Sequence, residues 1–149
     1  MATGEYKWRG GLCLEISPIP NTIIIFGASG ALAHRKLLPA LYNLSRRDLL
    51  HEKSRIIGCA RSPLDDEAFR KQVRDALPKC VVGMCGKTVE KFLSKLQYVS
   101  GAYDDPATYA KLSERIGAIE SDACCNAGRI YYLSTPSTLH STIVSHLGA

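Results

Sequence analysis

The sequence is short of the features that mark membrane, secreted and nucleic-acid-binding proteins. No apolar run approaches the roughly 18–20 residues that cross a bilayer, and the N-terminal arm "MATGEYKWRGGLCLEISPIP" has no apolar signal-peptide core. The formal net charge of +5 is scattered, without an arginine-rich run or an aromatic stacking pattern on a basic strand. These absences argue against a membrane protein, a secreted protein and a protein that binds nucleic acid. We therefore expect a cytoplasmic protein.

Metal-ligand spacing is also missing. The six cysteines form no C-x-x-C pair, and the four histidines have no ligand spacing with them. We therefore expect no metal site and, without a secretory signal, reduced thiols. Cys59 lies inside an apolar run, where it is predicted to pack as a small hydrophobe.

Apolar runs alternate with amphipathic segments along the 149 residues. The predicted strands are Thr22–Phe26, Arg55–Ala60, Leu96–Ser100 and Arg129–Ser134. The predicted helices are about Ala31–Leu50, broken or kinked at Pro39, then Pro63–Leu77, Lys87–Lys95, one capped by Asp105, and Thr135–Gly148. This order predicts an α/β fold with a doubly wound parallel sheet, a Rossmann-like dinucleotide-binding domain over residues 21–149 that follows an extended arm over 1–20.

The stretch "TIIIFGASGALAHRK" places a glycine-rich turn between a buried strand and a helix. Gly27 permits a sharp turn, Gly30 removes a side chain where a pyrophosphate must approach, and Ala33 allows close helix–strand packing. Ser29 adds a hydroxyl donor. Because the unpaired N–H groups and the dipole of a helix start attract anions, the turn predicts dinucleotide binding. A plain strand-to-helix connection is the alternative.

The end of the second predicted strand indicates which dinucleotide binds. NAD sites usually place an acid there for the ribose 2′-hydroxyl, whereas NADP sites place an arginine against the 2′-phosphate. The strand ends "CARS", with Arg61 and with no acid before Asp65. A guanidinium matches a phosphate in geometry and charge, so NADP is the predicted cofactor. A surface arginine is the alternative.

Other motifs fail on inspection. "VVGMCGKT" resembles a phosphate loop, but Val81 stands where that motif needs glycine. No Tyr is followed four positions later by Lys, which excludes the catalytic pair of short-chain reductases. His34, His140 and His146 have no evident carboxylate partner and are interpreted as surface or capping histidines.

Four motifs in order resemble the N-terminal domain of glucose-6-phosphate dehydrogenase. They are "IIIFGASGALAHRKLLPALYNL", "RIIGCARS", "YVSGAYDDP" and "RIYYLSTPS", and the resemblance runs from about Asn21 to Gly148. It implies a nucleotide-binding domain followed by a larger substrate domain. It also implies oxidation of glucose 6-phosphate to the lactone, with hydride transfer to NADP, in the oxidative pentose phosphate pathway.

The resemblance implies a set of cofactor-binding residues. The pyrophosphate turn comprises Gly27, Ala28, Ser29, Gly30, Ala31, Leu32, Ala33 and His34. Arg61 meets the 2′-phosphate, Tyr132 lies beside the cofactor, and Tyr103 borders it.

Two departures from the family pattern temper this expectation. Ala31 stands where the family usually has aspartate, which removes an acid worth about 0.3–1 kcal/mol at a helix N-terminus. The 149 residues also contain neither the family's E-K-P-F-G segment nor its R-I-D-H-Y-x-G-K segment, which carry the substrate lysines and the general-base histidine. No catalytic residue is therefore assigned, and the chain alone is expected to bind NADP without turnover.

Two alternatives remain open: a non-catalytic NADP-sensing module and an atypical short-chain reductase-like protein. Self-association is expected only through the family's larger domain, which these residues do not include.

Overall fold

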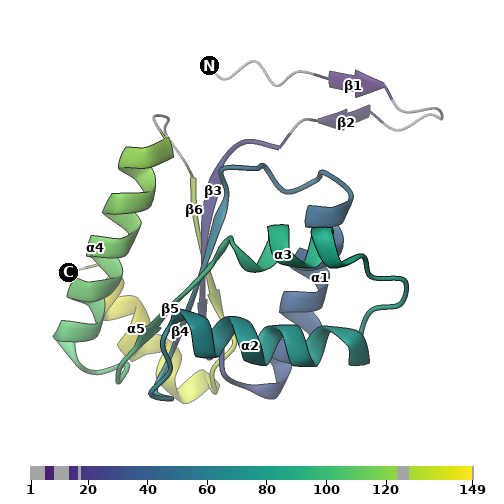
Figure 1. Ribbon diagram of the computed structural model, residues 1–149. Helices are drawn as coiled ribbons and strands as arrows, with labels where there is room; N and C mark the ends of the chain where they lie inside the picture. Colours follow the sequence, from purple (N-terminus) through teal and green to yellow (C-terminus); the bar gives the residue numbers. More distant parts are fainter. Residues whose placement is uncertain (1–5, 9–13, 17, 124–127, 149) are drawn as a thin grey trace.

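A computed structural model describes residues 6–8, 14–16, 18–123 and 128–148, so Cys13, Cys124 and Cys125 lie outside the described residues. A four-stranded sheet stands between two layers of helices (Figure 1). The strands of the sheet are β3 (Asn21–Phe26), β4 (Arg55–Ala60), β5 (Leu96–Ser100) and β6 (Gly128–Leu133). The helices are η1 (Ala33–Leu37), α1 (Leu38–Arg46), α2 (Asp66–Ala76), η2 (Leu77–Lys79), α3 (Gly86–Leu93), α4 (Pro106–Ala123), η3 (Ser137–Leu139) and α5 (His140–Leu147).

The strand order is β5-β4-β3-β6, and all neighbouring strands are parallel. The chain adds β4 and β5 on one side of β3 and then crosses to add β6 on the other side. The direction of winding therefore changes between β3 and β6. The predicted α/β fold with a doubly wound parallel sheet is confirmed.

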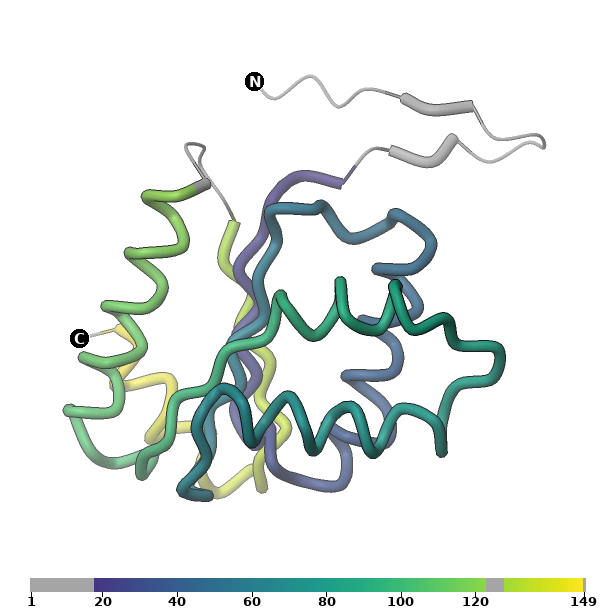
Figure 2. Tube along the Cα trace, viewed as in Figure 1, coloured from purple at the N-terminus to yellow at the C-terminus, as the bar shows by residue number. Residues whose placement is uncertain are grey.

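The sheet buries both faces. Helices α1, α2 and α3 cover one face, and α4 and α5 cover the other; the same two layers can be followed along the Cα trace (Figures 1 and 2). Alternate residues of β3 divide between the two cores, with Ile23 and Ile25 on the α1–α3 side and Ile24 and Phe26 on the α4–α5 side. Burial on both faces explains why β3 reads as an unbroken apolar run.

The helix after the glycine turn contains a π-helical segment. In η1 the Leu38 N–H donates to the Ala33 carbonyl, and Pro39 follows at the start of α1. Because Pro39 has no N–H and its ring crowds the carbonyl four residues earlier, the wider π-turn lets the helix continue past it. The proline therefore distorts this helix without ending it.

The same helix ends earlier than the predicted Leu50, at Arg46. Asp48 has a positive φ of 56°, and the Leu49 N–H donates to the Leu44 carbonyl at 2.9 Å. The Asp48 N–H donates to the Ser45 carbonyl at 3.2 Å. These bonds form a Schellman motif with aspartate in the position that usually holds glycine, so no glycine marks the end of this helix in the sequence.

Helix α2 begins at Asp66, three residues after the predicted start. The Asp65 side chain caps it by accepting from the Ala68 N–H at 2.7 Å. Helix α4 starts at Pro106 as predicted, with the Asp105 side chain accepting from the Ala107 N–H at 2.9 Å. The final predicted helix divides into η3 and α5, and α5 ends at Leu147 with Gly148 as its C-cap.

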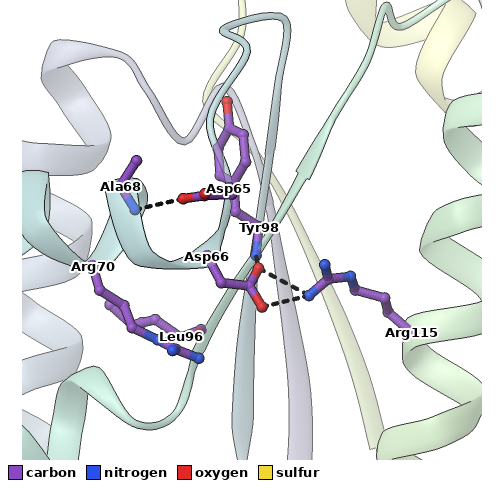
Figure 3. Close-up of polar contacts among 7 residues, drawn as sticks. All are labelled: Asp65, Asp66, Ala68, Arg70, Leu96, Tyr98 and Arg115. Carbon is purple, nitrogen blue, oxygen red and sulfur yellow. Dashed lines mark hydrogen bonds and ion pairs between the residues drawn. The ribbon is translucent and has the colours of Figure 1, made fainter.

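Side chains of α2 cover the free edge of β5 (Figure 3). The Asp66 carboxylate accepts from the Tyr98 N–H at 2.7 Å and from Arg115 of α4 at 2.8 and 2.9 Å. Arg70 donates to the Leu96 carbonyl at 2.9 Å. An edge strand otherwise offers unpaired backbone groups to another chain, so these two contacts close the edge.

The N-terminal arm contains a strand pair that the extended-arm prediction missed. β1 (Tyr6–Trp8) pairs antiparallel with β2 (Leu14–Ile16). Gly10 and Gly11 between them are a turn signal in the sequence. Among the described residues, no helix combines the length and the apolar character needed to cross a membrane.

Candidate functional site

The glycine turn lies at the carboxyl end of β3, where the direction of winding changes. In an open parallel sheet this edge, next to the change in strand order, is where ligands bind. The carboxyl ends of β4 and β6 flank it, because both strands pair in parallel with β3. The candidate site is therefore built from the loops that follow β3, β4 and β6.

Gly27 makes the turn possible. Its φ is +83°, which other residues rarely adopt, and its N–H donates to the Cys59 carbonyl at 2.8 Å. A Cβ at Gly27 would lie 2.6 Å from the Ser134 carbonyl oxygen, so a side chain is also sterically excluded. Ser134 holds the turn from the β6 side, since its Oγ donates to the Phe26 carbonyl at 2.7 Å.

The turn continues into a helix with free N–H groups. The Gly30 N–H donates back to the Gly27 carbonyl at 2.9 Å, and the His34 N–H donates to the Gly30 carbonyl at 3.2 Å. The first N–H groups of a helix have no partner within it, and no acidic side chain occupies the first turn of η1. The N–H groups at the start of this helix can therefore bind an anion such as a pyrophosphate.

The side chains of the turn point in different directions. Ala28 and Ala33 are fully buried in the core on the α1–α3 side, so only their backbone can contact a ligand. Gly30, Ala31 and Leu32 are exposed. A Cβ at Gly30 would lie 3.1 Å from the Gly27 carbonyl oxygen, a tight contact.

His34 is half-buried, with its ring edge-on to Phe69 at a centroid distance of 6.2 Å. Burial lowers the pKa of His34 below its ordinary value. The neutral ring is therefore favoured near pH 7.

The turns after β3 and β4 are tied together by hydroxyl groups. The Ser62 Oγ donates to the Ser29 Oγ at 3.0 Å. The Ser62 carbonyl accepts from the Tyr98 hydroxyl and from the Ser100 Oγ, both at 3.0 Å. Burial raises the pKa of Tyr98 to about 12, so its hydroxyl remains a donor at neutral pH.

Arg61 is exposed at the end of β4, next to Ser62. Burial raises the pKa of Tyr103 above its ordinary value, and the positive charge of Arg61 nearby opposes this shift. The structure thus brings Gly27, Arg61 and Tyr103 together at one end of the sheet.

Tyr132 lies beside Ile25 in the β3–β6 register and is exposed. It is two residues before Ser134, which contacts the turn directly. All of the residues predicted for the cofactor therefore lie on the turn itself or on the ends of β4, β5 and β6.

Sequence reasoning missed four residues of the site: Ser62, Tyr98, Ser100 and Ser134. Tyr98 and Ser100 are two positions apart on β5, so their side chains share one face of the sheet. This spacing of two hydroxyl groups could have indicated that Tyr98 and Ser100 belong to the site. Nothing in the sequence indicated that Ser134 supports Gly27.

Two further hollows lie elsewhere on the molecule. One, lined by Lys53, Arg55 and Asp122 among others, lies at the opposite end of the sheet from the glycine turn. Another lies between α4, α5 and β6. Within the described residues, no cluster of three or more His, Cys, Asp or Glu side chains could hold a metal ion.

Comparisons with known proteins agree on one family. Residues 24–149 match the family described as glucose-6-phosphate dehydrogenase, NAD binding domain. A glucose-6-phosphate 1-dehydrogenase of Aggregatibacter actinomycetemcomitans is 43% identical over 126 residues, which are 85% of this chain and 25% of that protein. One of Mycolicibacterium smegmatis is 37% identical over 136 residues, 89% of this chain and 27% of that protein.

Solved structures agree. A glucose-6-phosphate dehydrogenase in complex with its substrate glucose-6-phosphate has a TM-score of 0.78 and 36% identity, covering 86% of this chain and 27% of that one. A glucose-6-phosphate 1-dehydrogenase from Mycobacterium avium has a TM-score of 0.75 and 28% identity, covering 87% of this chain and 27% of that one. The chain spans about a quarter of the length of the relatives it matches.

Proposed function

The chain belongs to the glucose-6-phosphate dehydrogenase family, and on this premise we propose that residues 21–149 form an NADP-binding domain. The observation that carries the choice of NADP is Arg61, exposed at the carboxyl end of β4 and close to Gly27 and Tyr103. Between Arg61 and Leu64 the sequence has no acid that would instead accept a hydrogen bond from a ribose 2′-hydroxyl.

Each part of the site has one role in holding the cofactor. The turn from Gly27 to His34 would hold the pyrophosphate through the first N–H groups of its helix, those of Ala31, Leu32 and Ala33, with the Ser29 hydroxyl beside them. The Arg61 guanidinium would bind the 2′-phosphate. Tyr103 and Tyr132 would border the bound nucleotide. When bound, the nicotinamide supplies the acceptor for a hydride.

The activity of the complete protein is proposed from the family. We infer that it oxidises C1 of glucose 6-phosphate to the lactone, with hydride transfer to NADP, in the oxidative pentose phosphate pathway of the cytoplasm. Glucose 6-phosphate and self-association would involve the larger domain of the family. The substrate-lysine and general-base segments are absent from these 149 residues, so this chain is expected to bind NADP without reducing it.

A second candidate function is a non-catalytic NADP sensor. Ala31 favours it, because the residue is exposed at the start of the helix where the family usually has aspartate. Reduction of NADP by the 149-residue chain with glucose 6-phosphate above background would exclude the sensor and contradict the expected lack of turnover.

Titration calorimetry with NADP and NAD on the wild type and Arg61→Ala tests the choice of cofactor. Removal of Arg61 should weaken NADP binding about tenfold or more, while NAD binding changes less than about twofold, because only NADP has the 2′-phosphate. Arg74→Ala is the matched control, since Arg74 is an exposed arginine of α2 paired with Glu90. Equal losses for both nucleotides, or no loss, would contradict the role of Arg61.

A further inference from the structure

The carbonyl of Ser62 is a meeting point of three donors. It accepts from the Leu64 N–H at 2.8 Å, from the Tyr98 hydroxyl at 3.0 Å and from the Ser100 Oγ at 3.0 Å. The first bond closes a three-residue turn around Pro63, whose fixed φ suits such a turn. The other two come from β5, the neighbouring strand, and therefore fix the turn to the sheet.

This carbonyl is the anchor of a short loop. Arg61, Pro63 and Asp65 are exposed, and the loop joins the end of β4 to the capped start of α2. Arg61 lies directly before Ser62, so the position of the Ser62 peptide determines where the Arg61 side chain starts. The Ser62 hydroxyl, bonded to Ser29, fixes the same peptide relative to the glycine turn.

The register of the sheet explains how two β5 side chains reach Ser62. Tyr98 lies opposite Gly58, and Ser100 lies opposite Ala60. Gly58 leaves room for the Phe69 ring, because a Cβ at Gly58 would lie 2.8 Å from that ring. The Tyr98 ring packs against Phe69 with a centroid distance of 4.9 Å, which directs its hydroxyl towards the end of β4.

We propose that Tyr98 and Ser100 are positioning residues that set the selectivity for NADP over NAD, by holding the Ser62 carbonyl and with it the backbone of Arg61. The inference rests on the proposed function, since it needs Arg61 to bind the 2′-phosphate. Tyr98 is buried beneath the loop and acts through Ser62, without contact of its own with the nucleotide. The selectivity depends on position because a charge-assisted hydrogen bond weakens steeply with distance and angle.

The test is the ratio of the NADP and NAD dissociation constants. The double variant Tyr98→Phe/Ser100→Ala removes two hydroxyl donors and keeps the ring and the strand. NADP binding should weaken roughly three- to tenfold, while NAD binding changes less than about twofold. The control is Tyr42→Phe/Ser94→Ala, because Tyr42 also has a buried hydroxyl bond, to Thr88, and Ser94 also donates to a carbonyl, that of Lys91.

A double-mutant cycle with Arg61→Ala separates positioning from general stability. In the Arg61→Ala background, the Tyr98→Phe/Ser100→Ala change should leave the ratio unaltered, because the group being positioned is gone. Ser100→Thr keeps a hydroxyl and should restore most of the NADP affinity that Ser100→Ala loses. Since Ser100→Ala is small and Ser100 is only partly buried, this pair provides the test even if the double variant does not fold.

The outcomes distinguish the two proposals. If wild-type protein binds NADP no better than NAD, the proposed function fails and the inference fails with it. If the wild type is selective and Arg61→Ala abolishes that selectivity, but the Tyr98 and Ser100 variants leave the ratio unchanged or weaken both nucleotides equally, the inference alone is overturned.

Discussion

The two outer strands of the sheet, β5 and β6, resemble each other in sequence and differ in their surroundings. "LQYVS" and "RIYYLS" are both apolar and aromatic. The edge of β5 is closed by Asp66 and Arg70 of α2. In contrast, β6 exposes Ile130, Tyr131 and Tyr132. An apolar, β-branched or aromatic run therefore identifies a strand without indicating how much of it the fold covers.

The difference follows from which helices lie beside each strand. The chain passes through α2 and α3 between β4 and β5, and the first turn of α2 lies along the outer edge of β5 (Figure 3). The relatives are about four times as long as this chain, so they include residues that have no counterpart here. Two pairs of matched residues and one buried lysine test how far the contrast between the two strands extends.

The largest effect is expected for a pair of tyrosines. Tyr98 of β5 is 2% exposed and Tyr131 of β6 is 39% exposed. Tyr98→Ala should lower the free energy of unfolding by about 3–5 kcal/mol, because it leaves a cavity beside Phe69, and Tyr131→Ala by about 1 kcal/mol or less. Urea unfolding followed by circular dichroism measures both. Equal losses of unfolding free energy in the two variants would contradict the expectation that the buried tyrosine contributes more to stability than the exposed one.

The next effect concerns two carboxylates of nearly equal exposure. Asp66 is 29% exposed and paired with Arg115, and Glu120 is 27% exposed and paired with Arg129. Only Asp66 also accepts a β5 edge N–H. Asp66→Ala should therefore cost about 1–3 kcal/mol of unfolding free energy, and Glu120→Ala about 0–1 kcal/mol.

The pH dependence of stability provides a further test of the Glu120 contribution. The Arg129 hydrogen bond lowers the pKa of Glu120. Its small contribution is present above the ordinary glutamate pKa and is lost as the pH falls through the lowered value. Acid unfolding of the wild type and Glu120→Ala should converge at low pH, and a gap that persisted there would show that the Glu120 contribution is not electrostatic.

Another effect depends on pH and lies at the start of β5. Lys95 is buried and donates to the carbonyls of His51 and Glu52. Burial, with Arg55 and Lys91 nearby, lowers the pKa of Lys95 to about 8. Between this value and the pKa of about 10.4 in the unfolded chain, the folded protein loses the proton first, so stability rises with pH.

Lys95→Met isolates this contribution. The stability of the wild type relative to Lys95→Met should increase by about 2–3 kcal/mol from pH 8 to pH 10.5. Taking the difference between the two proteins cancels the opposing titration of Cys59, whose pKa burial raises to about 12. A difference that stays constant over this range would show that Lys95 keeps an ordinary pKa.

The parts of the fold that follow from local pattern were predictable. The four strands follow from apolar runs, and the Gly27 turn follows from the glycine that ends the first of these runs. The prediction of a parallel sheet follows from the alternation of these runs with helices. The end of α1 was not predictable, because Asp48 adopts a positive φ that only the Schellman bonds around it explain. The π-helical segment before Pro39 likewise depends on how the helix adapts to the proline.

In the candidate site, too, some features could be predicted from the local sequence and others depend on the folded structure. Its backbone features follow from glycine spacing, and Arg61 follows from its place at the end of a strand. The hydroxyl groups that contact Ser62 come from residues 33 to 38 positions away, so these contacts depend on how β4 is aligned with β3 and with β5. Sequence spacing within one element cannot reveal a register between two.

The bond between Ser134 and Phe26 also has a consequence for biosynthesis. It joins residues 108 positions apart and supports a turn that is made early in translation. Since β6 emerges from the ribosome last among the described strands of this sheet, the nascent chain carries an unfinished Gly27 turn until Ser134 has been made. The contact between Phe26 and Ser134 therefore completes the glycine turn of the candidate site. This step needs β6 as well as β3, because Phe26 is the last residue of β3 and Ser134 directly follows β6.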